Sequence, residues 1–233
     1  MTDLTTSLLE TLLCQQTLAR TVSGTSRPLA LLGMTVVLSA LSVGTLTSQC
    51  LTSYPSIESF ETDLGFWTQS TSDDYDWSRE TGVSSTGATG PASAMNGMYY
   101  LQAESSLFPN GSAAVQTCLD LTSYCASEIE FNYHMQGADI GELRVEASVD
   151  NGANWTTIWV ESGDQGASWY VKLLDLDSYL GGTVLIRFTA TNNGALGNIA
   201  LDNVRVRAFS EPSISEITQV DPTCELDLCL IHI

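Results

Sequence analysis

Short stretches in which apolar and polar side chains alternate are the most regular pattern along the chain. In residues 141–149, leucine, valine and alanine fall on one side of an extended chain, and glutamate and arginine fall on the other. Residues two apart share a face of a β-strand, so this pattern predicts a strand with one buried and one polar face. The Asp-Asn-Gly sequence at 150–152 favours the positive φ angles of a tight turn. We therefore predict a β-hairpin whose second strand covers residues 155–160.

Further stretches rich in β-branched and aromatic residues recur at short intervals after residue 58, separated by clusters of Gly, Asn and Ser. No long stretch in this part of the chain has apolar residues at helical spacing. Many short strands joined by such turns are typical of an all-β fold with two antiparallel layers, so we predict a jelly-roll-like β-sandwich. Eight strands are expected, at residues 98–103, 113–118, 128–135, 141–149, 155–160, 169–174, 183–190 and 198–208.

The N-terminal part of the chain has a different pattern. Residues 29–46 form an uncharged apolar run, preceded by Arg20 and Arg27. Its length lies between the apolar core of a signal peptide and a helix that spans a membrane. We expect residues 1–50 to be a cleaved signal peptide or an uncleaved signal-anchor helix. The protein would then be secreted, or anchored to the membrane by residues 29–46. At the other end, residues 209–233 are expected to form an irregular tail.

Export would place the cysteines in an oxidising compartment, where thiols pair. Cys118 lies close in sequence to Cys125, and Cys224 lies close to Cys229, so two local disulfides are the simplest arrangement. Cys50 is then unpaired or bonded to one of the others. Spacing alone leaves the connectivity open.

The charge of the chain excludes one class of partner. The net charge is −19, and only six of the eight basic residues lie after Cys50. Such a negative field repels the phosphate backbone of nucleic acids. We therefore expect no nucleic-acid partner, and membrane contact only through the N-terminal segment.

Several short groups of aromatic, glycine and acidic residues follow one another in a fixed order between residues 58 and 208. They are Ser59-Phe60-Glu61, Leu64-Gly65, Trp67, Asp73 to Trp77, Thr89-Gly90-Pro91, Gly97, Tyr99-Tyr100-Leu101, Phe131 to Met135, Gly137, Ile140-Gly141, Leu143, Gly163 to Gly166, Trp169 and Ile199 to Asp202. In this order the sequence resembles a MAM domain, the extracellular module of meprin-type proteases, neuropilins and receptor tyrosine phosphatases of the mu type. The resemblance implies an extracellular adhesion or protein-interaction module, whose partner is another protein or a second copy at a cell surface.

Aromatic residues of these groups are expected to pack between the two sheets, because large rings dominate the cores of such folds. This expectation covers Phe60, Trp67, Trp77, Phe131, Tyr133 and Trp169. His134 lies between Tyr133 and Met135 in a predicted strand. We interpret it as a hydrogen-bonded structural side chain and not as a catalytic base.

Carboxylates near the two ends of the predicted sandwich form a candidate cation site. Glu61, Asp74, Asp76 and Asp202 would converge if the first and last strands are neighbours. Calcium prefers oxygen ligands of this kind. The sequence therefore raises the hypothesis of a structural calcium ion, with solvated surface carboxylates as the alternative.

The sequence contains no motif that predicts catalysis. After residue 50 it has no HExxH, GxSxG, Walker or dinucleotide-binding glycine pattern. We predict that the chain is not an enzyme and assign no catalytic residue. The alternative to adhesion is a carbohydrate-binding module of a secreted protein, in which Trp155, Trp159 or Tyr170 would stack on a sugar ring.

Overall fold

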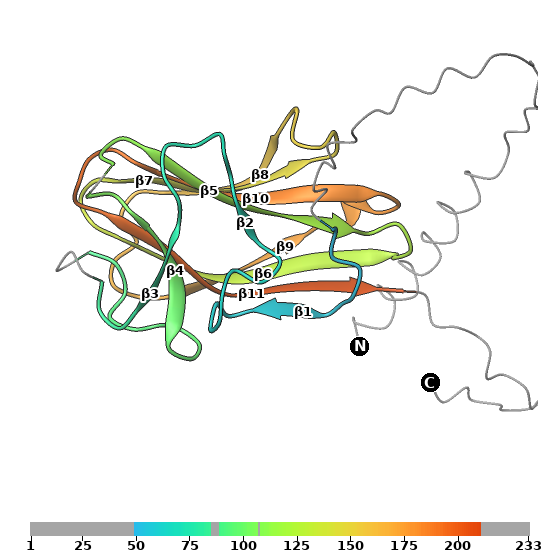
Figure 1. Cartoon of the computed structure of the whole chain (residues 1–233), viewed down its shortest axis with the longest axis horizontal. Helices are drawn as coiled ribbons and strands as arrows, with labels where there is room; N and C mark the ends of the chain where they lie inside the picture. The colour runs from blue at the N-terminus through green and yellow to red at the C-terminus, as the bar shows by residue number, and fades with distance from the viewer. Residues whose placement is uncertain (1–48, 85–88, 107, 211–233) are drawn as a thin grey trace, which may run out of the picture.

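The computed structural model describes residues 49–84, 89–106 and 108–210. They form two antiparallel sheets packed face to face, which confirms the predicted two-layer all-β sandwich (Figure 1). The first sheet has the order β3-β4-β11-β6-β9, with β1 also paired to β11, and the second has the order β2-β5-β10-β7-β8. The strands are β1 (Ser56–Glu58), β2 (Thr68–Gln69), β3 (Ser78–Thr81), β4 (Tyr99–Glu104), β5 (Ser112–Asp120), β6 (Ala126–Gln136), β7 (Ile140–Ser148), β8 (Thr156–Ser162), β9 (Tyr170–Asp175), β10 (Thr183–Asn192) and β11 (Asn198–Phe209).

The eight predicted strands correspond to β4 through β11. Sequence patterning missed β1, β2 and β3, which have two to four residues each. Strands this short contain too few residues to show an alternation. A single 3₁₀ turn, η1 (Asp177–Tyr179), follows β9.

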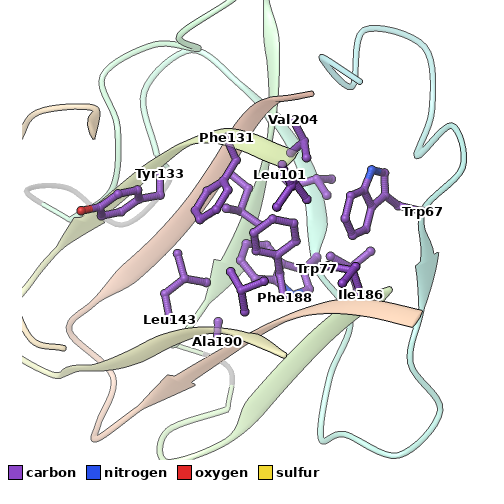
Figure 2. Packing of buried hydrophobic residues seen from close by; sticks show 14 of the residues in the cluster. Trp67, Trp77, Leu101, Phe131, Tyr133, Leu143, Ile186, Phe188, Ala190 and Val204 are labelled. Carbon is purple, nitrogen blue, oxygen red and sulfur yellow. The ribbon is translucent and has the colours of Figure 1, made fainter. Parts of the chain in front are cut away.

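The core fills the space between the sheets with aromatic and aliphatic side chains (Figure 2). Phe131 of β6 meets Phe188 of β10 edge to face, with ring centroids 4.8 Å apart. Trp67 also packs on Phe188, at 5.1 Å. Burial of such rings from both layers is the main apolar contribution to stability. The predicted core positions are confirmed for Phe60, Trp67, Trp77, Phe131 and Tyr133.

Trp169 differs from its predicted position. It is only partly buried and does not belong to the core cluster. Its ring covers His134 and Tyr100, at centroid distances of 5.5 and 6.0 Å, and its Nε1 donates a hydrogen bond to the Ser93 carbonyl oxygen at 3.0 Å. His134 and Tyr100 lie on the face of their sheet that is turned away from the core, so Trp169 covers the outside of the sandwich.

The predicted hairpin between β7 and β8 is confirmed, and its turn contains the expected residue types. Asn151 and Gly152 have φ angles of 58° and 85°. Asp150 holds the turn, because its carboxylate accepts hydrogen bonds from the Asn154 backbone N–H and side-chain amide at 2.8 and 2.7 Å. These bonds, with one from Ser148, lower the pKa of Asp150 to about 2.

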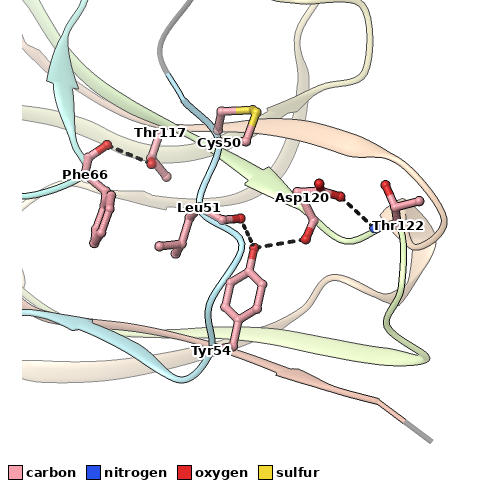
Figure 3. The surroundings of a disulfide bond; sticks show 8 residues. Cys50, Leu51, Tyr54, Phe66, Thr117, Asp120 and Thr122 are labelled. Atoms are coloured by element: carbon pink, nitrogen blue, oxygen red, sulfur yellow. Dashed lines mark hydrogen bonds between the residues drawn. A yellow bond between two sulfur atoms is a disulfide. The ribbon is translucent and has the colours of Figure 1, made fainter.

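A disulfide joins Cys50 to Cys118 (Figure 3), so the predicted local pairing of Cys118 with Cys125 is wrong. Leu51 exchanges backbone hydrogen bonds with Cys118 and Asp120, at 2.8 and 2.9 Å, which places Cys50 beside Cys118. Cys118 lies in β5, whereas Cys125 precedes β6 in the opposite sheet and keeps a free thiol. Cys224 and Cys229 lie outside the described residues.

The predicted N-terminal helix and most of the predicted tail also lie outside the described residues. Phe209 is the last residue of β11 and not the start of an irregular segment. Within the described residues, no helix has the length and apolar character needed to cross a membrane.

Candidate interaction surface

One side of the sandwich is formed by β8 and β9, the terminal strands of the two sheets. Exposed apolar side chains lie on the two outer faces of the sandwich beside this side. Val171 and Leu173 of β9 are 63% and 50% exposed, and Val160 of β8 is 46% exposed. Exposed apolar groups beside terminal strands are typical of protein contact sites. We refer to the exposed side chains and backbone of β8 and β9 as the β8–β9 edge.

An aromatic cluster lies behind this edge. Trp159 of β8 meets Tyr133 of β6 at a centroid distance of 5.2 Å, and Tyr170 of β9 stacks on the same Tyr133 at 5.7 Å. Trp159 also contacts Phe131 in the core, at 5.4 Å. Burial raises the pKa of Tyr133, and the charge of Glu161 raises it further. The cluster therefore connects the edge rigidly to the core.

Lys172 of β9 differs from the other basic residues in the partners of its side chain. The five arginines of the described residues interact with carboxylates or backbone carbonyls, whereas Lys172 makes no salt bridge in this part of the chain. Its Nζ lies 5.7 Å from the ring centroid of Trp159. The β8–β9 edge thus contains an unpaired cation in a chain whose net charge is −19.

Two of the four predicted cation ligands, Asp202 and Glu61, bind the backbone of one turn, residues 95–98. Asp202 Oδ2 accepts hydrogen bonds from the backbone N–H groups of Met95 and Asn96, both at 2.8 Å. Glu61 Oε1 accepts the N–H groups of Met98 and Tyr99, both at 2.9 Å. The two carboxylates therefore hold the backbone of this turn at both ends.

The electrostatics of the two carboxylates differ. Asp202 is fully buried. Burial raises its pKa to about 6, the nearby charge of Glu61 adds to this, and the hydrogen bonds from backbone N–H groups act in the opposite direction. The N–H groups of Tyr99 and Met98 lower the pKa of Glu61.

The other two predicted ligands have different surroundings. Asp74 Oδ2 accepts hydrogen bonds from the backbone N–H and the hydroxyl of Ser112, at 2.8 and 2.9 Å. Asp76 is exposed near Asp73, whose pKa is raised by burial first and by the charges of Asp76 and Asp74. These residues lie beside the start of β5 and not on the turn at 95–98.

The structure therefore does not bring the four carboxylates together at one place. Within the described residues, no three acidic, histidine or cysteine side chains come together in a metal-binding arrangement. Both oxygens of Asp202, Oδ2 of Asp74 and Oε1 of Glu61 already accept hydrogen bonds from the protein.

His134 is a buried side chain of β6. Its ring packs against Trp169 at a centroid distance of 5.5 Å. Burial lowers its pKa, whereas a hydrogen bond with the backbone of Ala167 and the charge of Asp164 act in the opposite direction.

The three aromatic residues predicted to contact a sugar occupy two places. Trp159 and Tyr170 belong to the cluster behind the β8–β9 edge. Trp155 lies elsewhere, with the Arg187 guanidinium 3.9 Å from its ring centroid. They therefore do not form a single platform.

Sequence reasoning did not single out Met95, Met98, Val171 or Leu173. A signal for the last two was present in the sequence, because residues 170–174 read Tyr-Val-Lys-Leu-Leu, with apolar residues on both faces of the predicted strand. Apolar residues on both faces are expected of a strand only when both faces are buried by other parts of the protein. Met95 and Met98 lie in a loop, where alternation gives no information.

Two curated relatives share part of this sequence. Human (Homo sapiens) zonadhesin is 32% identical over 149 residues, which covers 62% of this chain and 5% of that protein. Mouse (Mus musculus) zonadhesin is 38% identical over 82 residues, covering 34% of this chain and 2% of that protein. The chain thus spans only a small part of these relatives.

Similar solved structures include the K1 cleaved adhesin domain of Lys-gingipain from Porphyromonas gingivalis W83. It is 20% identical with a TM-score of 0.49, and the match covers 67% of this chain and 99% of that one. TmCBM61 in complex with β-1,4-galactotriose is 16% identical with a TM-score of 0.47, covering 64% and 94%. These values are too low to carry an argument about ligands.

A family model gives the decisive comparison. The model described as MAM domain, meprin/A5/mu matches residues 59–211, which is more than half of the chain. This range contains β2 through β11 and therefore nearly the whole sandwich. It confirms the resemblance seen in the sequence, and the chain belongs to the MAM domain family.

Proposed function

We propose that this chain is a non-catalytic adhesion module that binds other proteins outside the cell. It would be secreted, or anchored at the cell surface by residues 29–46. Membership in the MAM family supports an adhesion role. The observation that carries the proposal is the β8–β9 edge, where Val160 of β8 is exposed on one outer face of the sandwich, and Val171 and Leu173 of β9 are exposed on the other.

The construction of the edge suits a binding surface. The aromatic cluster of Trp159, Tyr133 and Tyr170 connects it to the core, so contact residues would lose little conformational entropy on binding. Aromatic groups backed by a rigid core are frequent binding hot spots.

Bead adhesion tests this function. Beads coated with the full chain should aggregate, or adhere to cells that display a partner. Treating the cells with protease should abolish adhesion, whereas treating them with glycosidases should leave it intact. Beads that neither aggregate nor adhere to any cell type tested would contradict the proposal.

Carbohydrate binding is the second candidate function. Tyr170 is partly exposed, and Trp159 and Lys172 lie close by, a combination of aromatic and polar groups that suits a sugar. However, one face of Tyr170 is already stacked on Tyr133. Adhesion that survives protease and is lost after glycosidase treatment, together with a positive glycan array, would favour this alternative.

A further inference from the structure

The sandwich has five terminal or short strands that could pair with another chain, and they are not equally protected. β1 has three residues, β2 has two, and β3 is a short polar strand of Ser, Arg, Glu and Thr. The pairing of β8 with β7 shifts register between Val145 and Glu146. Short length, charge and bulges are the usual features that prevent edge pairing. Only β9 combines six residues in regular register with exposed apolar side chains.

The backbone of β9 has free groups on its outer side. Its six residues pair with β6 from Tyr133 to Glu128, and the Leu176 N–H continues this ladder by donating to the Ser127 carbonyl oxygen at 2.8 Å. Bonding directions alternate along an antiparallel strand. The N–H and C=O groups of residues 170, 172 and 174 therefore point toward β6, and those of Val171, Leu173 and Asp175 point to the open side.

The side chains of β9 divide in the same way. Tyr170, Lys172 and Leu174 face the second sheet, where they contact Tyr133, Trp159 and the core. Val171 and Leu173 lie on the opposite face and are exposed. The strand contains one lysine and one aspartate, so it is locally neutral in a strongly acidic chain. Two copies that meet at β9 would avoid most of the repulsion expected at other surfaces.

We propose that two copies of this chain associate by antiparallel pairing of β9 with β9, which joins their sheets into one continuous sheet. This inference rests on the proposed adhesion function and names its partner as a second copy. A two-fold axis at Leu173 places Leu173 opposite Leu173 of the second copy, and Val171 opposite Asp175. All free backbone groups of β9 then find partners. The same register places Lys172 opposite Leu174 of the second copy. A two-fold axis at Lys172 would instead place the two Lys172 side chains, which carry the same charge, directly opposite each other.

Sedimentation velocity of the full chain over a wide concentration range tests this pairing. The wild-type chain should form dimers. Leu173→Lys should weaken association by about tenfold or more, because two like charges would then lie directly opposite each other. Ile57→Lys adds the same charge at a similarly exposed apolar position on β1, outside the β8–β9 edge, and should leave dimerisation unchanged. Circular dichroism would verify that both variants keep the fold.

A charge swap makes the test specific to the two-fold register. Mixing Leu173→Lys with Leu173→Asp should restore dimers as heterodimers, whereas each variant alone should associate more weakly than the wild type. A wild-type chain that remains monomeric at all concentrations, or a Leu173→Lys variant that dimerises as well as Ile57→Lys, would overturn the inference. If the chain is monomeric and its beads still adhere to cells, only the pairing is wrong, and the adhesion function stands.

Discussion

The Asp202 carboxylate accepts a hydrogen bond at 2.8 Å from the backbone N–H of Asn96, 106 residues earlier in the chain. It accepts the Met95 N–H with the same oxygen, and Glu61 accepts the N–H groups of Met98 and Tyr99. The turn between them presents Met95 and Met98 to solvent, 53% and 66% exposed. Carboxylates that sequence reasoning expected to bind a metal thus fix the backbone of a loop.

Removing either carboxylate should release its own half of the turn. In Asp202→Ala, the amides of Met95 and Asn96 should exchange with solvent faster, and in Glu61→Ala those of Met98 and Tyr99 should do so. Asp202→Ala should also lower the free energy of unfolding by about 3 kcal/mol, because it removes a fully buried side chain that accepts hydrogen bonds from the N–H groups of Met95 and Asn96. Residue-resolved hydrogen exchange measures both effects. Equal exchange of all four amides in the two variants would contradict separate anchoring.

The raised pKa of Asp202 predicts a specific pH dependence of stability. Its pKa in the folded chain is about 6, against an ordinary value of 3.8, so folding favours proton uptake. The contribution of this group is therefore fully present below about pH 3.8 and is lost as the pH rises through about 6. The stability of the wild type relative to Asp202→Asn should fall over this range. Denaturant unfolding at several pH values measures it, and parallel profiles would refute the prediction.

The sequence predicted the layers of the fold better than its edges. Along β7 and β10, side chains point alternately toward the opposite sheet and away from it, so the local sequence pattern indicates which of them face the core. β2 contains only Thr68 and Gln69, and its pairing with β5 is a long-range contact that no local pattern encodes. The position of Trp169 was predicted wrongly for a similar reason. Trp169 packs on the outer face of the sheet beside the loop that contains Ser93, and alternation along a strand gives no information about such a contact.

The candidate site was less predictable than the fold. Proximity of Glu61 to Asp202 was expected if the first and last strands are neighbours, and both carboxylates do bind the backbone of one turn. Their chemistry was not predictable, because the backbone N–H groups of a loop carry no sequence signal. The disulfide was missed because closeness in sequence favoured Cys125 as the partner of Cys118. In the structure, the parallel backbone pairing of Leu51 with Leu119 places Cys50 beside Cys118.

The Cys50–Cys118 bond should stabilise the sandwich, because it closes a loop between positions 68 residues apart. Cys50→Ser should lower the free energy of unfolding by about 2–4 kcal/mol, chiefly by restoring freedom to the unfolded chain. Cys125→Ser removes the free thiol instead and is the matched control, with no comparable loss expected. Chemical denaturation measures both. A reductant should bring the wild type to the stability of Cys50→Ser, and a reduced wild type that keeps its full stability would contradict the prediction.

We expect that the turn at residues 95–98 requires glycine at position 97 for two reasons, the backbone conformation there and the lack of space for a Cβ atom. Its φ angle is 71°, and a Cβ atom there would lie 2.4 Å from Glu61 Oε1. Gly82 has a similar φ of 68° but nothing within 4 Å of such an atom. Gly82→Ala should therefore cost about 1 kcal/mol through backbone strain alone, and Gly97→Ala should cost at least about 2 kcal/mol. Thermal unfolding compares them. Equal losses would show that Glu61 moves aside without cost.

His134 should make the chain less stable in mild acid. Burial holds its pKa below the ordinary value of 6.5, so the unfolded chain takes up a proton more readily than the folded chain. Its contribution to stability is present above about pH 6.5 and is lost as the pH falls below that value, which is the opposite direction to Asp202.

His134→Leu removes the titrating group and keeps an apolar side chain under Trp169. Its free energy of unfolding should therefore fall less than that of the wild type between pH 7 and 5. The two profiles, measured by denaturant unfolding in the same buffers, should converge or cross as the pH falls. A constant difference between them would mean that His134 stays neutral in both states or is protonated equally in both.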